Sequence, residues 1–379
     1  MQRVSISGSG LYTAPCVISN EELVASYNAH ARHFNEANAQ RIADGAIAAR
    51  EESSVDFIEK ASGITRRYVM DKEGVLDPQR MRPRFVPRRN DELSLQAEIA
   101  VDAGQQALAA QALAAAGCNP ADIDAVICAA SNMQRPYPAM AVEIQHALGI
   151  SQGYAFDMNV ACSSATFALD IAVNAVRSSS ARRVLIVDPE ICSAHLAWQD
   201  RDCHFIFGDV CTAIVVERLP PEPAPNSWEI LGSRLATSFS NNIRNNAGFM
   251  SRCEDRNPGD RDQLFVQEGR KVFKEVCPMA AEHITRHLAT LDLKPGQVRR
   301  FWLHQANLAM NQLIGRRLLG REATADEAPV ILDEFANTAS AGSIISFHRH
   351  SADLASGDLG VICSFGAGYS IGSLIVRKC

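Results

Sequence analysis

The stretch AFDMNVACSSATFALDIA, residues 155–172, places Cys162 between a strand-like run and a helix-like run. After the cysteine, apolar residues recur at helical spacing, at Ala165, Ala168, Leu169, Ala172 and Val176. We therefore expect Cys162 at the start of a helix, where unpaired N–H groups and the helix dipole lower the pKa of a thiol. Its small neighbours leave room for a reacting group. A cysteine that merely fits tight helix–sheet packing is the alternative at this point.

The order of elements around this stretch occurs twice in the chain. A turn at Pro120 recurs at Pro295, and the same offset of 175 residues relates Asn132 to Asn307. The offset also relates the strand VLIV (184–187) to LGVI (359–362), and Cys162 to Asn337. Helices expected over about 94–116 and 271–291 precede the two turns. Few identities survive, so the shared register of turn, strand and helix is the evidence for a duplication.

The boundary between the two halves is expected in a proline-rich linker. Residues 217–229 contain four prolines between the apolar runs AIVV and EILGSRLA. The predicted halves are 1–218 and 226–379, with an inserted helical and basic region over about 19–92. Repeated helix–strand–helix units with short apolar strands predict an α/β fold in which helices cover largely buried sheets.

Composition excludes several classes of protein. The net charge of -6 argues against a nucleic-acid partner, because phosphate binding needs a positive surface. No stretch approaches the 18 apolar residues of a membrane span, and no signal peptide is visible, so we expect a cytoplasmic protein. The eleven cysteines form no C-x-x-C pair or zinc-type cluster, which predicts small buried thiols and no metal. The basic run RMRPRFVPRRN (80–90) is either a solvated loop or a dock for an acidic partner or phosphate group.

Three further features of the second half could carry chemistry. His304 directly follows one expected strand and precedes a helix, and Asn337 follows a second expected strand among small residues. The segment VICSFGAGYSIGSLIVRKC is predicted to be two strands joined by a glycine-rich turn, which could aim an N–H at another group. Each feature alone has a structural explanation: a hydrogen-bonded histidine, a turn asparagine and a buried hairpin.

Taken together, these features resemble the β-ketoacyl-acyl carrier protein synthase III family, which has a thiolase-like fold of duplicated halves in α-β-α-β-α layers. The motifs occur in the family's order over nearly the whole chain: NVACSSA around Cys162, FIFGD (205–209), HQAN (304–307), ANTASA (336–341), FGAGYSIGSLIVR (365–377) and, less clearly, GFMS.

The resemblance implies an acyltransferase that joins an acyl thioester, such as an acyl-CoA, to malonyl-acyl carrier protein with loss of CO₂. It would give 3-oxoacyl-acyl carrier protein in the initiation of fatty acid synthesis or a related pathway. Cys162 matches the family's nucleophile, while His304 and Asn337 match the pair that holds the malonyl thioester carbonyl. The N–H groups of Cys162 and Ala367 would form the oxyanion hole. No cofactor is implied, since coenzyme A is part of a substrate.

The resemblance also assigns roles at the mouth of the site. Arg201 matches an arginine at the nucleotide end of coenzyme A, and Phe57 replaces a tryptophan that stacks on adenine. The residues implied in substrate binding are Phe57, Tyr137, Arg201, Gly269 and Asn307, and those implied in carrier-protein docking are Lys274, Arg316 and Arg317. Tyr137 matches an aromatic residue that crosses the dimer interface of the family, so a homodimer is implied.

Several alternatives remain open on sequence alone. An enzyme of the same fold could pass the acyl group from Cys162 to another acceptor, as in secondary metabolism. Degradative thiolases use a second cysteine near the C-terminal turn, but Cys363 lies before it. Papain-like hydrolysis uses the same residue types without duplicated halves. A non-catalytic subunit would be expected to lack one of the three residues. A dinucleotide loop at Gly8-x-Gly10 is excluded by Thr13 in place of the third glycine.

Overall fold

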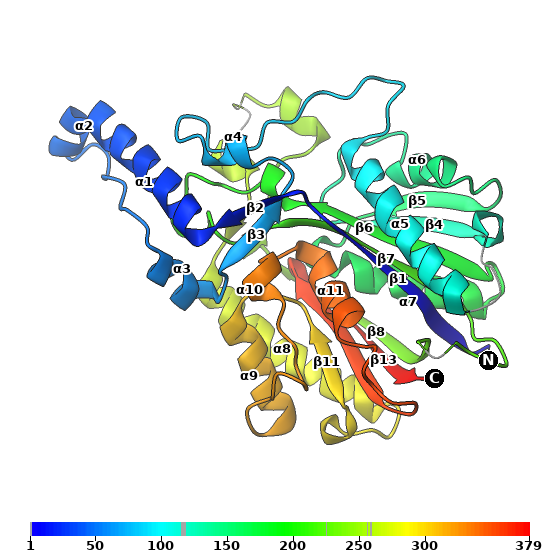
Figure 1. Ribbon diagram of the computed structural model, residues 1–379. Coiled ribbons are helices and arrows are strands. Elements are labelled where there is room, and N and C mark those ends of the chain that lie inside the picture. The colour runs from blue at the N-terminus through cyan, green and yellow to red at the C-terminus, as the bar shows by residue number, and fades with distance from the viewer. Residues whose placement is uncertain (1, 115–118, 225, 256, 258–259) are drawn as a thin grey trace.

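A computed structural model describes residues 2–114, 119–224, 226–255, 257 and 260–379 (Figure 1). Its central element is one nine-stranded mixed sheet. The strand order is β11-β12-β13-β8-β1-β7-β6-β4-β5. The strands are β1 (Val4–Thr13), β4 (Ala125–Ala129), β5 (Tyr154–Met158), β6 (Arg183–Ile191), β7 (Asp209–Arg218), β8 (Trp228–Ser240), β11 (Arg300–Leu303), β12 (Leu359–Gly366) and β13 (Gly368–Lys378).

The sheet contains the predicted repeat. In the first half β4 runs parallel to β6, β6 antiparallel to β7, and β7 antiparallel to β1. The second half repeats this pattern: β11 runs parallel to β12, β12 antiparallel to β13, and β13 antiparallel to β8. The two halves meet where β1 pairs with β8, at Ser5 opposite Glu229. The 3-10 turns η1 (Pro120–Asp122) and η6 (Pro295–Gln297) occupy equivalent positions, as the offset of 175 residues predicts.

Helices form three layers around the two half-sheets. Helix α5 (Leu95–Ala114) covers β1, β6 and β7 on one outer side, and α8 (Gly269–Ala289) covers β8, β12 and β13 on the other. Helices α7 (Ser164–Arg177) and α11 (Gly342–Arg349) contact strands of both halves and form the central layer. This is the predicted α-β-α-β-α arrangement. Helices α6 (Met140–Ala147) and α9 (Leu308–Leu319) complete the outer layers.

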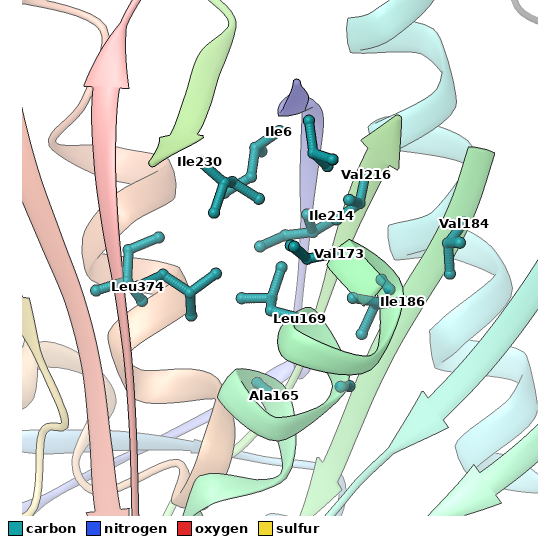
Figure 2. Close-up of a cluster of buried hydrophobic side chains, with 14 of the residues drawn as sticks. Ile6, Ala165, Leu169, Val173, Val184, Ile186, Ile214, Val216, Ile230 and Leu374 are labelled. Atoms are coloured by element: carbon teal, nitrogen blue, oxygen red, sulfur yellow. The ribbon is translucent and has the colours of Figure 1, made fainter. Parts of the chain in front are cut away.

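The central layer holds the largest apolar core. Figure 2 shows Ala165, Leu169 and Val173 on one face of α7, directed between strand residues such as Ile214 of the first half and Leu374 of the second. All five side chains are buried. Burying a leucine or valine side chain stabilises a fold by about 1.5–3 kcal/mol, so this helix holds the halves together as well as positioning Cys162 at its start.

The inserted region forms a cap with a separate apolar cluster. Its elements are β2 (Cys16–Ser19), α1 (Asn20–Ala37), α2 (Ala39–Ala43), α3 (Val55–Ser62), β3 (Arg66–Val69) and α4 (Lys72–Leu76). Ser19 and Glu22 form a capping box that starts α1, and α1 and α2 extend away from the rest of the molecule in Figure 1. Buried residues of the cap, such as Leu23 and Ile58, belong to the same cluster as Phe207 of the first half. The cap therefore packs above the region of Cys162.

The basic run 80–90 contains no helix or strand, and much of its charge is paired locally. Arg88 lies 2.6 Å from Glu98, and Arg89 lies 2.7 Å from Asp91. Arg80 donates to the carbonyls of Arg82 and Pro83. The run is therefore an exposed, internally bonded loop. Within the ranges described above, no helix combines the length and apolar character that crossing a membrane requires.

One predicted element is wrong. The segment before Asn337 is a short helix, α10 (Leu332–Phe335), and not a strand. Tertiary contacts with the cap select the helix, because the carbonyl of Asp333 accepts from Thr65 and the Glu334 carboxylate accepts from Tyr68. Asn337 itself forms only an isolated bridge with Phe207. The end of the first predicted helix, near residue 116, lies outside the described residues.

Candidate active site

Cys162 lies in the 3-10 turn η2 (Ala161–Ser163) that joins β5 to α7, as the sequence predicts. The turn packs against β12 and against η7 (Ala339–Ala341) of the second half. A Cβ on Gly366 would come within 2.5 Å of the Cys162 Cβ, so only glycine allows this contact. The Ser163 hydroxyl donates to the carbonyl of Ser370 over 2.8 Å. The C-terminal hairpin thus holds the cysteine turn in place.

The thiol of Cys162 is not acidified in the resting site, contrary to the prediction from the helix start. Burial and the nearby Glu190 raise its pKa to about 12, although the N–H groups of Ala367 and Cys162 itself act in the opposite direction. The reason is that desolvation outweighs the backbone dipoles. Those two N–H groups are the ones that the family resemblance implies for an oxyanion hole, and both act on the thiol.

We expect this raised pKa to govern alkylation of Cys162. The thiolate fraction of a thiol below its pKa rises about tenfold per pH unit. The rate of carboxamidomethylation at Cys162, followed by peptide mass spectrometry with iodoacetamide, should therefore rise steadily from pH 6 to pH 9. Alkylation of the exposed Cys253, measured in the same samples, corrects for loss of iodoacetamide. A plateau at Cys162 near pH 7 would show a preformed thiolate and contradict the expectation.

His304 follows β11 directly and is buried behind the cysteine turn. Its backbone N–H donates to the carbonyl of Cys363 over 2.8 Å, and its ring meets Phe365 edge-on with centroids 5.2 Å apart. Burial lowers the pKa of His304 to about 4, with the backbone of Ala339 opposing the shift. The imidazole is therefore neutral at ordinary pH and carries one N–H. Its Nδ1 is buried and has no hydrogen-bond partner among the described residues.

Asn337 is fixed by its backbone and its side-chain oxygen. Its N–H donates to the carbonyl of Ile206, its carbonyl accepts from Gly208, and its Oδ1 accepts from the N–H of Ala339 at 3.0 Å. The amide nitrogen Nδ2 makes no hydrogen bond to any described residue in the structure. A hydrogen-bond donor is thus left for a ligand.

A cavity of about 270 Å³ opens at the thiol. Ala339 lines it together with Cys162 and Ala367, and the same alanine contacts both His304 and Asn337. Phe207, Phe265 and His195 form apolar and aromatic walls. Of the three predicted residues, only Cys162 is among the lining residues of this cavity. His304 and Asn337 each interact with Ala339 in its wall, and the three residues come from separate turns. No group of metal-ligating side chains is present among the described residues.

Buried carboxyl groups brace the turns around the cavity. Glu190 accepts from the backbone N–H of both Ser131 and Ser340, and Ser340 also donates to Asp188. Burial raises the pKa of both carboxyl groups. Ser131 lines the cavity from the first half, whereas Ser340 belongs to the turn after Asn337. Glu190 thus connects turns of both halves beneath the site, a role that its sequence position did not indicate.

The residues predicted at the mouth of the active site form two groups, one under the cap and one at the starts of α8 and α9. The Arg201 guanidinium lies 3.9 Å from the ring centroid of Phe57, and its Nε donates to the carbonyl of Glu52. Arg201 also lines a larger cavity of about 1290 Å³ under the cap. Asn307 caps α9 through the N–H of Ala309 and donates to the carbonyl of Ala61. Gly269 begins α8 with open space around its Cα.

The remaining predicted residues are exposed. Tyr137 is 81% exposed, although it is a large aromatic residue. Arg316 forms an ion pair with Glu322, while Arg317 and Lys274 are exposed. These three basic residues lie on α8 and α9, which pack against each other.

The fold is that of a thiolase-fold condensing enzyme. Residues 156–238 match the family described as 3-oxoacyl-[acyl-carrier-protein] synthase III, and residues 288–378 match its C-terminal part. The chain is 58% identical, over 93% of its length and 99% of the relative, to a β-ketodecanoyl-[acyl-carrier-protein] synthase of Pseudomonas aeruginosa. It therefore belongs to the β-ketoacyl-acyl carrier protein synthase III family, and is an acyltransferase of the condensing type.

Two more distant comparisons agree. The chain is 29% identical to a β-ketoacyl-[acyl-carrier-protein] synthase III of Bartonella henselae, over 87% of its length and 93% of that protein. The crystal structure of 3-oxoacyl-[acyl-carrier-protein] synthase III from Aquifex aeolicus superimposes with a TM-score of 0.75 at 22% identity, covering 99% of both chains. The second comparison supports the fold.

Proposed function

We propose that this enzyme condenses a medium-chain acyl-CoA with malonyl-acyl carrier protein to give 3-oxoacyl-acyl carrier protein, coenzyme A and CO₂. The observation that carries the proposal is the set of donors around Cys162. Two backbone N–H groups act on its thiol, and a neutral histidine and an unpaired asparagine amide both interact with Ala339 in the wall of the same cavity. Two sets of donors near one nucleophile suit two successive carbonyl reactions.

In the first step, the sulfur of Cys162 attacks the carbonyl carbon of the donor thioester. The N–H groups of Cys162 and Ala367 stabilise the oxyanion, and the bond to the coenzyme A sulfur then breaks. The thiol proton leaves with the coenzyme A thiolate, so the step is balanced. Because the pKa of Cys162 is about 12 in the resting site, we expect proton transfer to accompany attack rather than precede it.

In the second step, the malonyl thioester occupies the same cavity. Its carbonyl oxygen accepts hydrogen bonds from His304 and Asn337, which stabilise the enolate formed when the bond to the carboxylate breaks and CO₂ leaves. The enolate carbon attacks the acyl-cysteine carbonyl, a carbon–carbon bond forms, and the carbon–sulfur bond breaks. The released Cys162 thiolate takes up a proton. A neutral His304 serves this role because its pKa is about 4.

The chain length of the donor is inferred from the relative that is 58% identical. That protein is named for a β-ketodecanoyl product. Condensation with malonyl adds two carbons, so a ten-carbon product requires an eight-carbon acyl donor. We infer that the present enzyme also uses an acyl group of about this length.

The same proposal assigns residues to the binding of both thioesters and to the assembly of the enzyme into a homodimer. Arg201 lines the large cavity where the nucleotide end of coenzyme A would lie, and its guanidinium lies over the ring of Phe57. Asn307 and Gly269 would contact the remainder of the substrate. Lys274, Arg316 and Arg317 would dock the acidic carrier protein. The exposed Tyr137 would be covered in a homodimer.

The proposal is tested by following both products. Purified enzyme is incubated with malonyl-acyl carrier protein labelled with ¹⁴C in the free carboxyl group, and with acyl-CoA donors of two to twelve carbons. We expect CO₂ release and 3-oxoacyl-acyl carrier protein in equal amounts, with the largest kcat/KM near eight carbons. Acylation of Cys162 without CO₂ release would support the alternative, an enzyme that passes the acyl group to a different acceptor.

A further inference from the structure

A second cavity continues from the one at Cys162. It has a volume of about 250 Å³, and it shares Asn132, His195, Asn245 and Ala247 with the 270 Å³ cavity at the thiol. The two cavities are therefore adjacent, with these four residues between them. His195 stands at the junction, with its ring 5.3 Å from that of Phe207.

The apolar walls of the second chamber come from several separate parts of the chain. Its floor is formed by Leu95 at the start of α5, Met133 in the loop after β4 and Ile191 at the end of β6. Phe85 and Val86 form its roof, from within the basic run of the inserted region. The two roof residues are 37% and 81% exposed, so apolar area remains open beside an apolar hollow.

Two polar side chains of this chamber are already bonded to their surroundings, whereas neither ring nitrogen of His195 has a hydrogen-bond partner among the described residues. Gln96 donates to the carbonyls of Asn132 and Pro189 and accepts from the N–H of Gln134. Arg88 pairs with Glu98. Burial lowers the pKa of His195 to about 4, so the junction carries no charge. An apolar occupant would therefore displace no hydrogen bond of these groups and would meet no buried cation.

We propose that the loop 82–92 determines donor specificity, with Phe85 and Val86 covering the far end of the acyl chain bound to Cys162. The inference rests on the proposed function and adds the location of the chain and the element that selects its length. A short acyl group ends within the first chamber. A longer one enters the second, where each further methylene is removed from water against Phe85, Val86, Met133 and Ile191.

Two variants change the second chamber in different ways. Met133→Trp fills it, and the double variant Phe85→Ser with Val86→Ser makes its roof polar. The measured quantity is the ratio of kcat/KM for octanoyl-CoA to that for butyryl-CoA. We expect each variant to lower this ratio by about tenfold or more, since two to three methylenes lose apolar cover. Val17→Trp and Val17→Ser are matched controls, because Val17 is also apolar and 39% exposed but lies on β2 of the cap.

The outcome separates this inference from the proposed function. If both variants keep the wild-type ratio while Cys162 is still acylated, the second chamber does not hold the chain and the inference is overturned. If wild-type Cys162 takes up no acyl group from any donor, the proposed function itself fails. A ratio lowered equally by the Val17 variants would also overturn the assignment, because the effect would not be specific to the roof.

Discussion

Cys162→Ala should take up no acyl group from octanoyl-CoA, and its rate of condensation should fall on the order of 10⁴-fold or more, as when other enzymes lose their nucleophile. The N–H groups of Cys162 and Ala367 both act on the thiol, so two donors would be available to the oxygen of an acyl carbonyl formed there. Intact-protein mass spectrometry after incubation with the donor measures the covalent adduct directly.

Cys363→Ala is the matched control for this result. Cys363 is also buried in the second half, close to the C-terminal turn, and burial raises its pKa. Its Sγ faces the carbonyl of Ser364 in β12, so no role as a second nucleophile is expected. The control variant should still gain one acyl mass. If Cys162→Ala still gained an acyl mass and Cys363→Ala did not, the assignment of the nucleophile would be reversed.

The fold could be predicted from sequence because the duplication preserves local rules. The turns at Pro120 and Pro295 and the strands that follow them recur in register, and each strand is short and apolar. The exception is α10, before Asn337, where bonds to Thr65 and Tyr68 of the cap decide the local structure. Such contacts join residues more than 260 positions apart, and no local pattern contains them.

The site could be predicted in part, for a related reason. Cys162, His304 and Asn337 occupy equivalent or adjacent turns of the duplicated halves, and their positions follow from the repeat. The pKa of Cys162 could not be predicted, because it depends on burial and on Glu190. Phe85 and Val86 were hidden within a run that reads as a solvated basic loop. Their proximity to Met133 and Ile191 arises only in the folded structure, so no local pattern could indicate it.

His304→Ala and Asn337→Ala should separate the two steps of the reaction. Removing one donor from an oxyanion site typically costs about 10²–10³ in rate. We therefore expect each variant to form the acyl-Cys162 adduct while condensation and CO₂ release fall by about that factor. The physical reason is that the first step would rely on the backbone N–H groups of Cys162 and Ala367, which these substitutions leave in place. Adduct formation is measured by mass spectrometry and CO₂ release with labelled malonyl-acyl carrier protein.

Isosteric replacements distinguish a donor from a merely structural residue. Asn337→Asp keeps the shape and the Oδ1 that accepts from Ala339, but exchanges the free amide donor for a carboxylate oxygen. It should lose condensation as severely as Asn337→Ala. His304→Gln retains an N–H donor on a shorter side chain and should recover part of the activity lost in His304→Ala. Normal condensation by Asn337→Asp would show that the amide stabilises no enolate, because a carboxylate next to that negative charge must raise the barrier.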